Sequence, residues 1–96
     1  MIAIEIRVNG KLVATCGVEG AHNISAIVSA RRGPKSPSGE MIYTLECIGV
    51  RPKSPKTDEV LKWLATRISL GDDISFKLVE AASAQEPIDK QEISNR

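Results

Sequence analysis

Residues 1–18, MIAIEIRVNGKLVATCGV, carry the clearest structural signal in the chain. Apolar and polar side chains alternate on both sides of the pair Asn9-Gly10. Alternation with a period of two is typical of a half-buried strand, and an Asn-Gly pair between two such runs is the strongest short-range indication of a β-hairpin. The stretch therefore predicts two antiparallel strands that are joined at Asn9-Gly10.

The alternation also predicts the register of this hairpin. A two-residue turn would pair Ile6 with Val13 and would turn the apolar residues of the second strand toward water. A type I turn with Gly10 as a left-handed G1 bulge instead pairs Ile6 with Leu12, and it keeps every apolar residue on one face. We therefore predict the bulged turn. Its further pairs are Ile4 with Ala14 and Ile2 with Cys16.

The composition is that of an ordinary soluble domain. The chain has 96 residues, of which 42% are hydrophobic and 26% charged, and its net charge of +1 implies neither nucleic acid nor an acidic membrane as a partner. No leader-like segment and no apolar run of about 18 residues is present, so we expect a cytoplasmic protein without a membrane span. Cys16 and Cys47 fall at inward positions of predicted strands, where we expect small core residues and no disulfide.

Two later segments are predicted as strands without an alternative. Residues 41–50 place Tyr43 among their inward side chains, and residues 74–79 do the same with Phe76 after a tight turn over 70–73. Both aromatic side chains are therefore assigned to the core.

Two other segments leave two alternatives each. Residues 24–32 alternate as a strand but also carry an apolar stripe at helical spacing, and their Ser and β-branched content favours the strand. Residues 57–68 are either a short helical turn capped by Thr57, which we slightly favour, or a short strand that buries Trp63.

Loops and a tail complete the chain. Residues 32–40 and 51–55 contain Pro and Ser and are predicted as loops. From Ala81 to Arg96 the chain is too polar to offset its ordering entropy, so we expect a mobile tail.

These segments predict a mainly β protein over residues 1–80. The expected fold is a small antiparallel sandwich or curled sheet of about five strands, with at most one or two short helices. The alternative is an α+β β-grasp, which opens with the same hairpin and places a helix next, here over 24–32.

Two resemblances bear on these alternatives. The opening hairpin, together with Leu70-Gly71-Asp72-Asp73-Ile74 before the final strand, is similar to the sulfur-carrier branch of the β-grasp family. Those proteins act through a free Gly-Gly carboxy terminus, which has no counterpart in Ser94-Asn95-Arg96, so carrier chemistry is not implied. The layout of residues 1 to about 80, with its Asn-Gly hairpin and Trp63, also resembles a group of small uncharacterised bacterial proteins. That resemblance implies a bacterial, soluble, β-rich protein.

No arrangement typical of catalysis stands out. His22 is the only histidine, and Cys16 is predicted to point into the core, where a thiol is inert. A zinc site needs about four ligands at suitable spacing, and Asp72-Asp73 has the simpler role of bonding its own turn. We therefore expect a non-enzymatic protein without cofactor or metal.

Charge placement is uneven along the chain. Residues 31–56 hold six basic side chains against two acidic ones. If 24–32 and 41–50 pair as a hairpin, the two basic loops lie at opposite ends of strand 41–50. The candidate binding residues are Arg31, Arg32, Lys35, Arg51, Lys53 and Lys56.

By elimination we expect a binding module whose partner is another protein. It would be an immunity or inhibitor-like protein that covers its partner's surface with residues 31–40 and 51–56, using arginines as anchors. The alternative is nucleic-acid binding through basic loops 31–35 and 51–56, which is less favoured because exposed aromatic side chains for base stacking are lacking. No membrane partner is expected, and an exposed edge strand would allow a homodimer.

Overall fold

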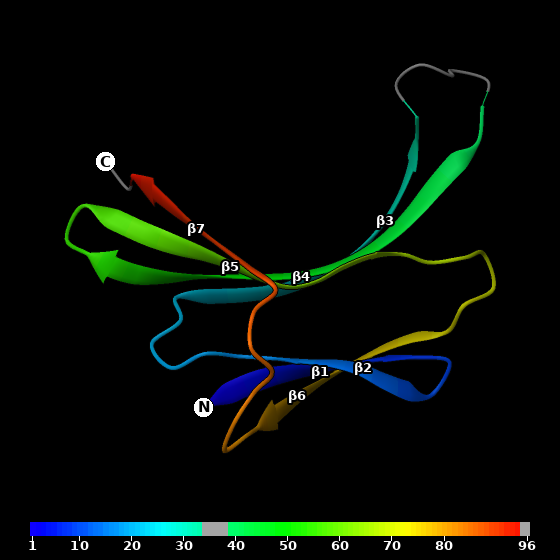
Figure 1. Cartoon of the computed structure of the whole chain (residues 1–96). Coiled ribbons are helices and arrows are strands. Elements are labelled where there is room, and N and C mark those ends of the chain that lie inside the picture. Colours follow the sequence, from blue (N-terminus) through cyan, green and yellow to red (C-terminus); the bar gives the residue numbers. More distant parts are fainter. Residues whose placement is uncertain (34–38, 95–96) are drawn as a thin grey trace.

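The computed structural model describes residues 1–33 and 39–94, which form seven strands in two antiparallel sheets (Figure 1). This confirms a mainly β, sandwich-like fold, with more strands than expected and without the short helices or the β-grasp helix. Across the described residues there is no helix, and hence none that could cross a membrane. The strands are β1 (Ile2–Val8), β2 (Lys11–Cys16), β3 (Asn23–Arg32), β4 (Met41–Ser54), β5 (Thr57–Arg67), β6 (Ile74–Glu80) and β7 (Asp89–Ser94).

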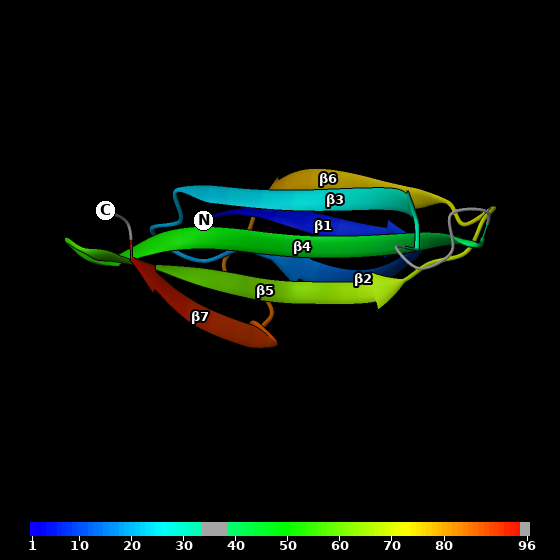
Figure 2. The same cartoon turned by 90° about the horizontal axis from the view of Figure 1, so that it is seen from above.

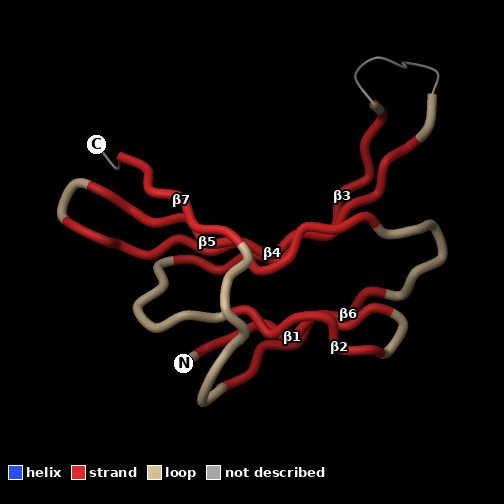
Figure 3. Tube along the Cα trace, viewed as in Figure 1, coloured by secondary structure: helices blue, strands red, loops and turns tan. Residues whose placement is uncertain are grey.

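The two sheets pack face to face. One has the strand order β2-β1-β6 and the other the order β3-β4-β5-β7. The loops 17–22, 68–73 and 81–88 carry the chain from one sheet to the other (Figure 3). Seen from above, β3 and β6 lie along one side of the sandwich, and β7 lies along the opposite side (Figure 2).

The core lies between the sheets and is centred on Trp63. This residue is 1% exposed and belongs to β5. Gly49 of β4 lies against its indole ring, because a Cβ atom built on Gly49 would be 2.8 Å from Trp63 Cζ3. The buried side chains around it come from both sheets: Ile4, Ile6, Ala14, Cys16, Leu45, Cys47 and Leu61.

The opening hairpin has the predicted strands but not the predicted turn. Asn9 and Gly10 both have positive φ, 54° and 81°, as in a two-residue type I′ turn. Val8 accordingly pairs with Lys11. The expected G1 bulge and its register are therefore wrong, although Gly10 is left-handed as predicted.

The residue that restores the apolar face is Val13. It is the extra residue between the pairs Arg7–Leu12 and Ile6–Ala14, where the register shifts. After this bulge, Ala14 and Cys16 lie on the same face as the isoleucines of β1 and are buried.

The strand prediction for 24–32 is confirmed by β3, whereas the helical turn favoured for 57–68 is wrong. Residues 57–67 are β5, and the alternative strand that buries Trp63 is the one observed. Glu59, Leu61 and Trp63 are buried in strict alternation along β5. Because the first of these residues, Glu59, is acidic, the period of two that is typical of a strand is not apparent in the sequence.

The segment 51–55 also differs from its prediction. β4 continues through Ser54, and the turn is confined to Pro55-Lys56. Residues 51–54 pair with β5, so they do not form a loop.

The mobile tail expected from Ala81 is not what the structure has over residues 81–94. The chain crosses to the other sheet, and β7 pairs with β5 from Lys62–Asp89 to Thr57–Ser94. Backbone pairing to β5 stabilises a segment that has few apolar side chains of its own.

Candidate functional site

The structure separates the candidate basic residues into two groups at opposite ends of β4 (Figure 1). Arg31 and Arg32 end β3, whereas Arg51 and Lys53 lie near the other end of the β3–β4–β5 sheet. Lys56 lies in the turn between β4 and β5. Lys35 falls outside the described residues. The candidate basic residues that the structure describes therefore do not form one surface.

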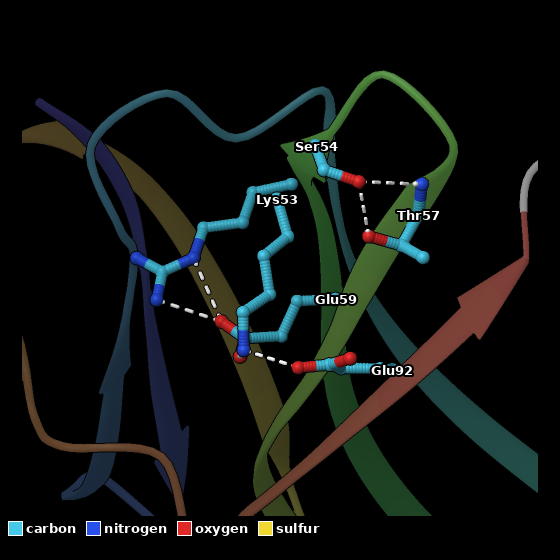
Figure 4. Close-up of polar contacts among 6 residues, drawn as sticks. Lys53, Ser54, Thr57, Glu59 and Glu92 are labelled. Atoms are coloured by element: carbon cyan, nitrogen blue, oxygen red, sulfur yellow. Dashed lines mark hydrogen bonds and ion pairs between the residues drawn. The ribbon is translucent and has the colours of Figure 1, made fainter.

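Carboxylates neutralise the group on β4. Arg51 donates to Glu59 Oε1 from Nε at 2.9 Å, and its Nη2 is 2.7 Å from the same oxygen. Lys53 bonds to Glu92 of β7, and its Nζ lies 3.8 Å from Glu59 Oε2 (Figure 4). The hydrogen bond from Arg51 lowers the pKa of Glu59. These two cations are engaged within the fold, so they are poor candidates for binding an external anion.

Arg31 and Arg32, the basic group on β3, have a different environment. Among the ion pairs of residues 1–33 and 39–94, none includes Arg31 or Arg32, and both residues are exposed. Arg32 donates one hydrogen bond, from Nη1 to the Gly39 carbonyl oxygen at 3.0 Å. The β3–β4 ladder extends to the pair Arg32–Met41, whereas β5 follows β4 only to Thr44. The two arginines thus lie on a two-stranded projection.

One side of the sandwich leaves interior-facing side chains uncovered. Phe76 and Leu78 of β6 pair directly with the core residues Ile6 and Ile4, so they point to the same face. They are nevertheless 47% and 74% exposed. The assignment of Phe76 to the core is therefore wrong.

The uncovered region continues onto the other sheet. Val28 of β3 lies opposite the fully buried Leu45 and is still 48% exposed. Ile2, on the inward face of β1, is also exposed. We call the surface formed by Ile2, Val28, Phe76, Leu78 and the edges of β3 and β6 the open side.

The opposite side of the sandwich is closed by the crossing segment 81–88. Gln85 N donates to the Thr15 carbonyl oxygen at 3.0 Å, and Trp63 Nε1 donates to the Gln85 carbonyl oxygen at 3.0 Å. The Gln85 side chain returns a hydrogen bond to the Trp63 carbonyl oxygen at 3.3 Å. One side of the core is therefore covered by the chain itself, and the other is not.

β3 and β6 are also the edge strands on the open side. In the described part of the chain, β6 pairs with β1 alone and β3 with β4 alone. Both ladders run without a bulge, and neither strand contains proline. Bulges and prolines are common devices that prevent edge-to-edge pairing, so these edges are open to another strand.

The remaining reactive groups are buried or scattered. Cys16 and Cys47 are fully buried, and a hydrogen bond between their thiols together with burial raises the pKa of Cys16. His22 is exposed in the loop before β3. Within residues 1–33 and 39–94, no three His, Cys, Asp or Glu side chains gather where they could hold a metal ion.

A hollow of about 390 Å³ lies beneath the crossing segment. Its charged lining includes Glu19, Arg51 and Lys90, and Arg51 is already paired with Glu59. The hollow offers less to a partner than the open side does.

Comparison with known proteins gives no match to a family model, to a curated protein or to a solved structure. The open side is the candidate site that the sequence patterns did not indicate. Alternation in 74–79 correctly indicated a strand with one apolar face, but it carries no information about whether another strand covers that face.

Proposed function

We propose that this chain is a non-enzymatic protein-binding module whose open side covers a surface of its partner. The observation that carries the proposal is Leu78, which points to the same face as the core and is 74% exposed. Contiguous exposed apolar side chains beside polar or charged ones are typical of protein interaction sites.

Arg31 and Arg32 are the anchors in this proposal. They lie at one end of the open side. A partner bound there would place acidic side chains against the two arginines, and an apolar surface or a strand against the rest of the open side. Arginine is enriched at the hot spots of protein interfaces, because its planar guanidinium group forms bidentate hydrogen bonds with carboxylates. The partner is thus expected to be a protein with an acidic and apolar contact surface.

The mechanism is steric. A module bound through its open side prevents other molecules from reaching the same surface of the partner, as immunity and inhibitor-like proteins do. The setting we propose is the bacterial cytoplasm.

Nucleic-acid binding is the weaker alternative. A phosphate backbone requires cations distributed along one surface, whereas Arg51 and Lys53 lie away from Arg31 and Arg32 and pair with Glu59 and Glu92. No specific observation favours it.

The test is capture from a lysate of the source organism, with the tagged chain immobilised and with nuclease added to half of each sample. We expect one stoichiometric protein that survives nuclease. Capture should fall at least about tenfold for Leu78→Glu and for Arg31→Glu/Arg32→Glu, since both changes place charge where the interface would form.

Ile88→Glu is the matched control. Ile88 is 62% exposed and directly precedes β7. Figure 2 shows β7 on the side away from β3 and β6. This variant should capture as much protein as the wild type. Capture that ends with nuclease, or that is equal in all variants, would contradict the proposal.

A further inference from the structure

The two edges of the open side belong to different sheets and run in opposite directions. In Figures 1 and 2, β3 runs toward the end of the molecule where the loop 68–73 lies, and β6 starts at that end and runs away from it. A two-fold axis along these strands, midway between the sheets, would place β3 of one copy beside β6 of the other. Because the rotation keeps strand directions, both new pairs would be antiparallel.

The charges at the strand ends complement each other in this arrangement. β3 ends with Arg31-Arg32, and β6 is preceded by Asp72-Asp73. Antiparallel pairing brings the end of one strand beside the start of the other, so the arginines of each copy would meet the aspartates of the other. Asp73 is exposed, whereas Asp72 already accepts hydrogen bonds from Ser69 N and Asn9 Nδ2.

The apolar side chains satisfy the same symmetry. A two-fold interface uses the same patch on both copies, so the patch must complement itself. Val28 comes from one sheet, and Phe76 and Leu78 come from the other. The rotation would therefore place the exposed residues of each sheet over those of the second copy.

We propose that the partner of the open side is a second copy of this chain, an inference that rests on the proposed function. In the homodimer, β3 of each copy pairs with β6 of the other. The two sandwiches then share two continuous sheets, each with the strand order β2-β1-β6-β3-β4-β5-β7.

The experiment is the molar mass of the purified full chain in solution, measured by sedimentation equilibrium over a range of concentrations. The wild type and the Ile88→Glu control should have twice the 10.4 kDa mass of one chain. Leu78→Glu should raise the dimer dissociation constant at least about tenfold, because two carboxylates would be buried at the symmetric interface.

A charge exchange tests the orientation of the strands. Asp73→Arg alone and Arg31→Glu/Arg32→Glu alone should each weaken the dimer about tenfold, and their combination should recover most of the loss. If Trp63 emission shows that Leu78→Glu does not fold, the charge exchange still tests the dimer.

A monomer at every concentration would overturn the inference, as would a dimer that is insensitive to these variants. A monomeric wild type that still captures a different protein through Leu78 would overturn the homodimer and leave the proposed function standing. A dimer that captures no protein other than its own chain would support the second copy and exclude a separate target.

Discussion

At the scale of single residues, the opening hairpin shows what alternation predicts and what it leaves open. The sequence requires one extra residue if the isoleucines of β1, Ala14 and Cys16 are to share a face. The extra residue is present, but it is Val13 and not Gly10. Asn-Gly favours the type I′ turn, because the twist of that turn matches the twist of the strands. The extra residue therefore lies three positions later in the chain than predicted.

Gly49 provides the residue-scale prediction. A Cβ atom at this position would lie 2.8 Å from Trp63 Cζ3, closer than real contacts allow, and the fully packed ring has little room to move. We expect Gly49→Ala to lower the free energy of unfolding by about 1–3 kcal/mol. Urea unfolding followed by Trp63 fluorescence measures this change.

Gly33→Ala is the control for this measurement. Among the residues that the structure describes, its Cβ atom would meet Ile42 Cδ1 alone, at an ordinary 3.8 Å. Equal unfolding midpoints for the two variants would mean that the indole ring does not pack on Gly49 as described.

At the scale of elements, β5 and β7 show why sequence patterns failed in the second half of the chain. Glu59 occupies an inward position that an apolar residue would normally mark, so β5 could be mistaken for a helical turn. β7 has no buried side chain, and it is ordered through backbone pairing with β5 and through the Lys53–Glu92 ion pair. Neither interaction leaves a periodic signal in a single sequence.

The pH dependence of stability tests the role of Glu59. Its pKa lies below the ordinary value of 4.5 because Arg51 donates a hydrogen bond to the carboxylate. A carboxyl group whose pKa is lowered by folding stabilises the fold above its unfolded-state pKa, and this contribution is lost as the pH falls through the folded-state value.

We therefore expect Glu59→Gln to be less stable than the wild type at pH 7, and we expect the difference to shrink at pH 3. Urea unfolding at the two pH values measures both differences. A gap that stays constant or widens in acid would show that the Arg51–Glu59 pair does not stabilise the fold.

At the scale of the whole molecule, the closed and open sides differ in what covers the core. Alternation in 41–50 and 74–79 correctly predicted strands and their apolar faces. Which strands end at an edge depends on pairing between segments far apart in the chain, such as β1 with β6. Leu78 and Leu45 therefore look alike in the sequence, although one is 74% exposed and the other fully buried.

The prediction of the binding surface was limited in the same way, because it also depends on which distant segments pair. The uneven charge in 31–56 drew attention to six basic residues, of which Arg31 and Arg32 end β3, an edge strand of the open side. The partners of Arg51 and Lys53 come from β5, where the sequence slightly favoured a helical turn over a strand, and from β7, where it predicted a mobile tail.

Backbone amide hydrogen exchange, compared between the wild type and Leu78→Glu at the same high concentration, tests the open side most directly. Our expectation is that amides of β3 and β6 exchange more slowly in the wild type, and that this difference is absent from β2 and β7. Exchange that is equal in the two proteins along β3 and β6, or slowed instead along β2 and β7, would contradict it.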